Sequence, residues 1–120
     1  MTTERSRRGR SAEDAALTLL RGHGLRLLAR NVRSRGGEID LVMRDGDTVV
    51  FVEVRSRRRS DYGTAAESVG ARKQQRLIHA ARTWLARNPR DARRPLRFDV
   101  VAYTGADEAE WLRNAIEVSA

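Results

Sequence analysis

The sequence contains no cysteine, which excludes disulfide bonds, thiolate metal sites and a cysteine nucleophile. Histidine is scarce too, because His23 and His79 alone are too few for a histidine-based zinc site. No stretch approaches the roughly 18 consecutive apolar residues of a membrane helix, and the N-terminus lacks the apolar core of a secretory signal. These absences predict a cytoplasmic protein without a membrane segment.

Acidic residues are in the minority, and the formal net charge is +8 with a sequence pI of about 11.3. A surplus of this size favours a polyanionic partner, with DNA or RNA ahead of an anionic membrane surface. Lysine is nearly missing, because Lys73 is the only one among 24 basic residues. Such an arginine bias can reflect genome composition, so the charge predicts the class of partner rather than individual contacts.

Residues 37–57 contain two runs of alternating apolar residues on either side of Asp45-Gly46. This dipeptide favours a tight hairpin turn because both of its residues tolerate a positive φ. The alternation has the period of a β-strand. The stretch therefore predicts a β-hairpin, and the rest of the chain is organised around it.

The acids of this hairpin fall on one face, because alternate residues of a strand point the same way. A two-residue turn at Asp45-Gly46 pairs Asp40 with Phe51, whereas a four-residue turn places Asp40 directly opposite Glu53. In either register Asp40 and Glu53 share a face. The same face carries Glu38 and Arg55.

Carboxylates on such apolar strands need a partner, since burying them unpaired costs several kcal/mol. Nearby arginines or a solvated face would meet that need. A divalent cation such as Mg²⁺ would also meet it, because it prefers carboxylate oxygens and water. Arg55, two positions after Glu53, favours the metal interpretation, because a phosphate bound beside a metal at these acids would need a positively charged partner. In that interpretation Asp40 and Glu53 bind the metal. Glu13 or Glu38 then holds a metal-bound water.

Basic residues follow the acidic face along the chain. The candidate nucleic-acid contacts are Arg57, Arg58, Arg59 and Tyr62 in a loop, and Arg72, Lys73, Gln75 and Arg76 at the start of a helix. The helix dipole adds to the positive charge, and the ring of Tyr62 suits stacking on a base or sugar. The alternative is a solvated loop and helix face. His79, further along this helix, is expected to be a partly buried packing residue.

Residues 1–10 are expected to form a flexible basic tail, and residues 11–120 a single domain. Ser11 is a candidate N-cap of the first helix, and in its first turn Glu13 would stabilise the helix dipole. Asp99 is expected to pair with Arg97 or a neighbouring strand.

The expected elements follow the order α-β-β-β-α-β-β. They are a helix from Ser11 to near Gly22, a strand over 25–33, the hairpin, a helix over 68–87, a strand over 96–103 and a last segment over 110–118, for which a strand is favoured over a short helix. The helix between the third and fourth strands permits a parallel crossover. The predicted fold is therefore α/β, with a mixed sheet flanked by helices.

Asp40, followed thirteen positions later by Glu53-Val54-Arg55, resembles the PD-(D/E)xK nuclease superfamily. The wider pattern is similar to the YraN-type family of small bacterial proteins, which look like Holliday-junction resolvases. The matching pieces are Glu13, residues 31–33, GEIDL at 37–41, VFVEVR at 50–55, Tyr62-Gly63, Val69 with Lys73 and Gln74, and RFDVV at 97–101.

This resemblance implies a restriction endonuclease-like core and a nuclease that uses Mg²⁺ or Mn²⁺ to cut DNA, branched or single-stranded. It implies that Glu13, Asp40 and Glu53 are the metal-site acids. Arg55 occupies the lysine position of the motif, and Glu38 matches the YraN-type pattern. Because nucleases of branched DNA often work as symmetric dimers, a homodimer is a further implication, and DNA is favoured over RNA.

Two positions depart from the superfamily pattern. Arg55 replaces a lysine, which removes any mechanism that uses a neutral amine as base, because guanidinium stays protonated. Ile39 stands where the motif has proline. The alternatives are a non-catalytic nucleic-acid-binding protein with a degenerate site and, third, a protein-interaction adaptor whose charge maintains solubility.

Overall fold

The computed structural model describes residues 4–57, 69–104 and 108–116, with side chains described for 11–56, 69–104 and 109–116. The proposed contacts Arg58, Arg59 and Tyr62 lie outside the described residues. Arg57 is described only by its backbone, as the last residue of a strand.

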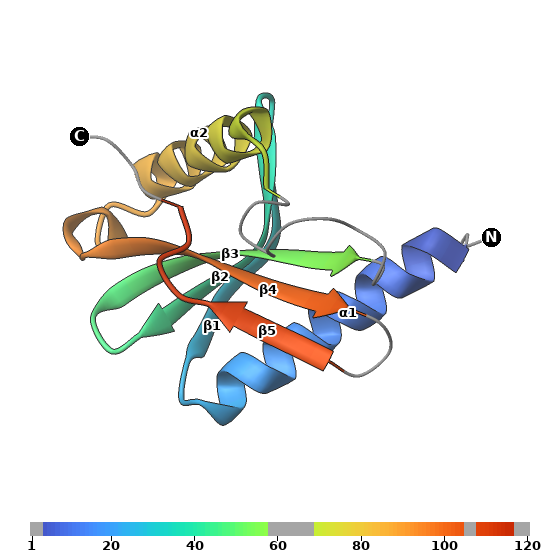
Figure 1. Ribbon diagram of the computed structural model, residues 1–120. Coiled ribbons are helices and arrows are strands. Elements are labelled where there is room, and N and C mark those ends of the chain that lie inside the picture. The colour runs from blue at the N-terminus through green and yellow to red at the C-terminus, as the bar shows by residue number, and fades with distance from the viewer. Residues whose placement is uncertain (1–3, 58–68, 105–107, 117–120) are drawn as a thin grey trace.

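The elements are α1 (Glu4–Gly22), β1 (Arg26–Ser34), β2 (Gly37–Asp45), β3 (Thr48–Arg57), α2 (Ala71–Arg87), a short 3-10 helix (Asp91–Arg93), β4 (Leu96–Thr104) and β5 (Glu108–Leu112). This confirms the predicted α-β-β-β-α-β-β order. The strands form one sheet in the order β1-β2-β3-β4-β5, and β3 and β4 are the parallel pair, joined through α2. Helices α1 and α2 lie on opposite sides of the sheet (Figure 1).

The core has two layers because β3 is apolar on both of its faces, as expected for a strand covered on both sides. Phe51 faces α2 and packs against Trp84 and Phe98, at ring-centroid distances of 6.0 and 5.2 Å. Val50 and Val52 face α1. Each fully buried apolar side chain of this kind contributes about 1.5–3 kcal/mol. The predicted alternation along this strand is therefore confirmed.

The β2–β3 turn corrects the simplest prediction. Asp45 pairs with Thr48, so Gly46 and Asp47 are the central residues, and Gly46 has a φ of 58°. A positive φ at the first central position is typical of a type II′ turn, which favours glycine there. The predicted two-residue turn at Asp45-Gly46 is wrong. The strands nevertheless pair in the register predicted for the four-residue turn, with Arg44 opposite Val49 and Leu41 opposite Val52.

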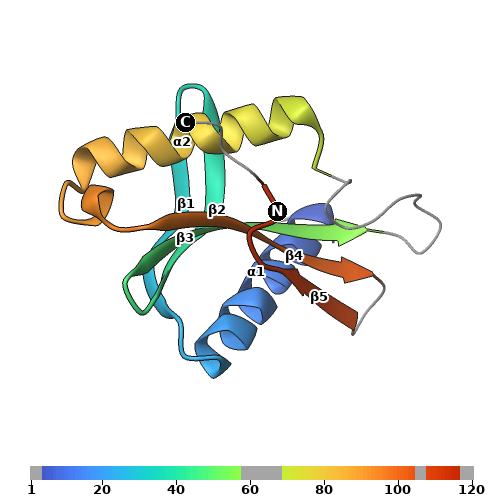
Figure 2. The ribbon, with the colours of Figure 1, turned by 60° about the vertical axis from the view of Figure 1, so that its left-hand side comes forward.

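The β1–β2 hairpin bends where it leaves the sheet. β2 pairs with β3 only from Leu41 to Asp45, whereas its pairing with β1 continues to the hairpin tip. Asn31, opposite the bend, has a φ of 49°, a conformation that asparagine tolerates better than most residues. Beyond the bend the hairpin rises from the sheet towards α2 (Figure 2). Asp40 lies at the bend, and β3 beyond Val52 has lost its β2 neighbour.

Two glycines let the tip of this hairpin lie directly against α2. A Cβ on Gly37 would overlap the carbonyl oxygen of Arg76, and one on Gly36 would come within 2.6 Å of the ring of His79. Any larger residue would push the tip away from the helix. The Gly36-Gly37 pair is therefore required by close packing of backbone on backbone.

Three boundaries differ from those predicted. Helix α1 begins at Glu4, so its predicted start at Ser11 is wrong. The helix continues through Gly9, because a glycine in a helix costs only about 1 kcal/mol relative to alanine. Helix α2 begins at Ala71, and β5 ends at Leu112. No helix in the described part of the chain is long and apolar enough to cross a membrane.

Candidate functional site

Asp40 and Glu53 come together where β2 separates from β3. They occupy the next step of the register after the Leu41–Val52 pair. The backbone N–H of Val54 donates a hydrogen bond to Asp40 Oδ2 at 2.8 Å. The carboxylate thus supplies the acceptor that a departing strand no longer provides. The main chain of β3 therefore fixes the position of Asp40.

Glu53 projects from β3 towards α2 and is almost completely buried, with 4% of its surface exposed. Lys73 of α2 places its Nζ 3.2 Å from Glu53 Oε1. The second oxygen, Oε2, is buried and accepts no hydrogen bond. A buried carboxylate with a free oxygen is costly in its charged form. This oxygen marks the place where the site lacks a donor or a cation.

The two carboxylates perturb one another. Burial raises the pKa of Glu53 to about 8, the charge of Asp40 adds to the shift, and Lys73 opposes it. Burial also raises the pKa of Asp40, against the opposing effects of the Val54 N–H and a hydrogen bond with Glu53. The raised pKa of Glu53 means that the pair holds a proton near neutral pH.

Helix α1 contributes a third acid, Glu13. Burial raises the pKa of Glu13, and the charge of Asp40 is the second cause of that rise. Glu13 Oε1 is buried without a hydrogen-bond partner. Because α1 already begins at Glu4, Glu13 lies beyond the first turn, and the prediction that it stabilises the helix dipole there is wrong.

Glu38 and Arg55 lie at the margin of this group. Glu38 is exposed and lies 3.8 Å from Arg33, although its charge still raises the pKa of Asp40. Arg55 is half-buried on β3 and shares the face of Glu53 by strand alternation.

The donor set fits a hard divalent cation, because all of its donors are carboxylate oxygens. Among the described residues, no three or more acidic, histidine or cysteine side chains stand close enough together to form a metal site. Mg²⁺, however, commonly takes one or two protein carboxylates and keeps several waters. The Asp40–Glu53 pair is sufficient for that mode of binding.

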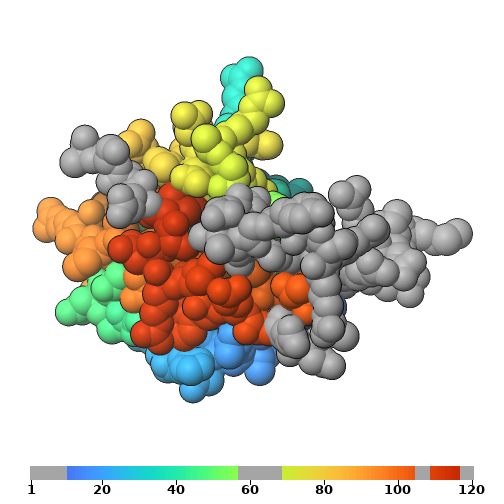
Figure 3. All heavy atoms as spheres, viewed as in Figure 1, coloured from blue at the N-terminus to red at the C-terminus, as the bar shows by residue number. Residues whose placement is uncertain are grey.

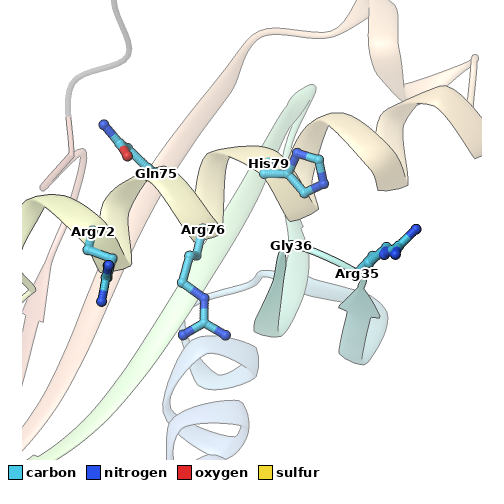
Figure 4. Close-up of a pocket in the computed structure, with 6 residues that line it drawn as sticks. All are labelled: Arg35, Gly36, Arg72, Gln75, Arg76 and His79. Carbon is cyan, nitrogen blue, oxygen red and sulfur yellow. The ribbon is translucent and has the colours of Figure 1, made fainter.

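The predicted contacts on α2 divide into two groups. Lys73 turns inwards to Glu53, whereas Arg72, Gln75 and Arg76 are exposed. These three line a pocket of about 570 Å³ together with Arg35, Gly36 and His79 (Figure 4). The prediction that His79 is a partly buried packing residue is wrong, since it is exposed. In the space-filling view α2 and the hairpin tip project together from one side of the molecule (Figure 3).

Sequence reasoning missed two features of this site. It did not find Arg35, whose signal is its position directly before the Gly36-Gly37 tip. It placed Lys73 among the nucleic-acid contacts and not with the acids. The signal for Lys73 was its being the only lysine in a chain where arginine supplies every other basic side chain.

The mixed five-stranded sheet, with a helix on each face and acids on a bent second strand and the central strand, defines an α/β protein consistent with a restriction endonuclease-like core. The chain belongs to the YraN-type family described as "Uncharacterised protein family UPF0102", whose sequence profile matches residues 12–103. It is 57% identical over 113 residues to a UPF0102 protein of Pseudomonas entomophila, covering 91% of this chain and 92% of that one. It is also 58% identical over 112 residues to a UPF0102 protein of Stutzerimonas stutzeri, covering 91% and 93%.

Proposed function

We propose that this protein is a metal-dependent nuclease that hydrolyses phosphodiester bonds in DNA, with branched or single-stranded DNA as the favoured substrate. The observation that carries the proposal is the buried Asp40–Glu53 pair with its free oxygen Glu53 Oε2. This demand for a cation sits in a protein of net charge +8, which favours a polyanionic partner. A divalent cation between a carboxylate pair and a phosphate satisfies both demands.

Asp40 and Glu53 would hold Mg²⁺ or Mn²⁺, and Glu13, with its free Oε1, would orient a water beside them. When bound, such an ion polarises a phosphoryl oxygen and lowers the pKa of water. Glu38, exposed at the margin of the site, would help to attract the metal through its negative charge. Arg55, as a guanidinium, would bind the scissile phosphate and stabilise negative charge as it develops.

Lys73 supplies the amine that position 55 lacks. Its Nζ lies 3.2 Å from Glu53 Oε1, so a lysine reaches the acids from α2 although none is present on β3 beside Glu53. We assign Lys73 the role of holding Glu53 in place and offering its ammonium to the phosphate.

The test is a cleavage assay on single strands, duplexes, flaps and four-way junctions, each with Mg²⁺, Mn²⁺ or EDTA. We expect cleavage that requires the metal and falls at least ~10³-fold in the Asp40→Asn/Glu53→Gln double variant, since both proposed metal ligands are lost. The amides preserve size, so thermal unfolding checks that the fold persists. Cleavage by the double variant at the wild-type rate would sink the proposal.

A second candidate function is a nucleic-acid-binding protein with a degenerate catalytic site. The observation that favours it is the Lys73–Glu53 ion pair, which neutralises one acid without any metal. This candidate predicts salt-sensitive DNA binding that is equal in EDTA and in Mg²⁺, with no turnover. The same panel, read for both binding and cleavage, separates the two functions.

A further inference from the structure

We infer that the pocket between α2 and the tip of the β1–β2 hairpin binds backbone phosphates of the nucleic acid beside the acid pair. That the bound nucleic acid is the substrate rests on the proposed function, whereas phosphate binding in the pocket is argued from the geometry of the pocket alone. Its lining consists of Arg35 and Gly36 from the hairpin tip and Arg72, Gln75, Arg76 and His79 from α2 (Figure 4).

The lining matches a phosphate in charge and in hydrogen bonding. It has three arginines, a histidine and an amide, and no acid. Guanidinium groups present paired N–H donors that fit phosphate oxygens. Other arginines of the described chain, among them Arg30 and Arg97, pair with acids. No ion pair joins Arg35, Arg72 or Arg76 to a described acid.

The convergence of two elements distinguishes this pocket from an ordinary solvated helix face. Arg35 is brought to α2 because Gly36 and Gly37 let the hairpin tip touch the helix: a Cβ on Gly37 would overlap the Arg76 carbonyl. The tip therefore has to lie close to the helix for the pocket to exist. A row of arginines on α2 alone would need no such packing.

The pocket also lies at a useful distance from the acid pair. Lys73, which contacts Glu53, is followed on α2 by Arg76 and His79. At ~1.5 Å of rise per residue these lie about 4.5 and 9 Å further along the helix axis. One DNA strand rises ~3.4 Å per phosphate. The pocket would therefore take backbone phosphates within a few nucleotides of the bond at the acid pair.

The test measures binding of a labelled single strand and a labelled duplex by fluorescence anisotropy, with the full chain in EDTA at several salt concentrations. The Arg72→Ala/Arg76→Ala variant removes two charges from the pocket. The matched control, Arg82→Ala/Arg87→Ala, removes two exposed charges from the same helix outside it. A third variant, Arg35→Ala, tests the hairpin tip separately.

We expect the pocket pair to weaken duplex binding about tenfold or more and to flatten the slope of log K against log[salt] by about 2, near 0.9 for each lost phosphate contact. Arg35→Ala should flatten it by about 1, and the control pair should change little. Equal losses in the pocket and control pairs would mean diffuse surface charge and overturn the pocket. No effect of Arg35→Ala would overturn it as a two-element site.

The same variants separate this inference from the proposed function. Loss of binding confined to the pocket variants, with no cleavage by the wild type, supports the pocket and overturns the nuclease. Metal-dependent cleavage with an unchanged KM in the Arg72→Ala/Arg76→Ala variant supports the nuclease and overturns the pocket. Thermal unfolding of each variant confirms that the fold is intact.

Discussion

The sheet contains two places where carboxylates are buried, and they differ in how completely those carboxylates are bonded. Asp99 on β4 is fully buried. It accepts hydrogen bonds from Arg97 Nε at 3.1 and 3.2 Å, from Trp111 Nε1 at 3.0 Å and from the Asn114 backbone at 2.9 Å. At the bend of β2, Asp40 accepts one from Val54, whereas Glu53 keeps a buried oxygen that accepts none.

Burial of an acid therefore does not by itself indicate function. The bonds to Asp99 tie β4 to β5 and to the turn that follows, and they satisfy the charge where it stands. The Asp40–Glu53 pair gains no comparable set of donors. Burial raises the pKa of both carboxyls, the charge of Asp40 raises that of Glu53 further, and Lys73 only partly opposes these effects. The unmet bonding capacity is what identifies the candidate site.

Matched amide variants test this contrast most directly, and the effect should be the largest. Asp99→Asn removes a buried charge that accepts hydrogen bonds from Arg97, Trp111 and the Asn114 backbone, and should lower the free energy of unfolding by about 3 kcal/mol although Arg97 keeps its ion pair with Asp45. Glu53→Gln replaces a carboxyl that burial keeps protonated at pH 7 with a neutral group of the same size, and should not lower the free energy of unfolding. Urea denaturation at pH 7 in EDTA measures both. Equal losses in the two variants would show that the two sites do not differ.

The pH dependence of stability tests the raised pKa of Glu53. Between its ordinary pKa of 4.5 and its folded pKa of about 8, the folded protein holds a proton that the unfolded chain has released. Stability from this group is complete below pH 4.5 and is lost as the pH rises through 8, by up to ~1.4 kcal/mol per pH unit. Unfolding measured from pH 5 to 8 in EDTA should show this decline, and Glu53→Gln should flatten it.

Adding a divalent cation to the same experiment tests whether a metal binds at Glu53. If a metal takes the place of the proton, millimolar Mn²⁺ should raise the wild-type melting temperature at pH 8 and leave that of Glu53→Gln nearly unchanged. Stabilisation of both proteins to the same extent would place the cation elsewhere.

The smallest effect is expected at Lys73, which supplies a positive charge to one oxygen of Glu53 and leaves the other without a partner. Its charge lowers the pKa of Glu53, so Lys73→Met should raise that pKa further, whereas Lys73→Arg should preserve it. A ¹³C NMR titration of the glutamate carboxyls measures the change. An unchanged Glu53 titration in Lys73→Met would show that the ion pair contributes nothing in solution.

Much of this architecture could be predicted from the sequence, because strand alternation placed Asp40 and Glu53 on one face for a turn of either two or four residues. The resemblance placed Glu13, which lies on a separate helix, among the metal-site acids. The bend could not be predicted, since alternation treats a strand as straight and a positive φ at Asn31 leaves no periodic signal. The Lys73–Glu53 contact depends on how α2 packs across the sheet, which spacing along the chain does not encode.

The bent hairpin carries Asp40 at its bend and Arg35 at its tip, and the tip is seated on α2 through glycine. The length of the hairpin between its bend and its tip thus sets the separation between the acid pair and the pocket beside α2. A hairpin longer by two residues on each strand would move the tip roughly 6–7 Å outwards. In the proposed enzyme the length of the hairpin would therefore influence which phosphodiester bond meets the acids when the backbone is held at the tip.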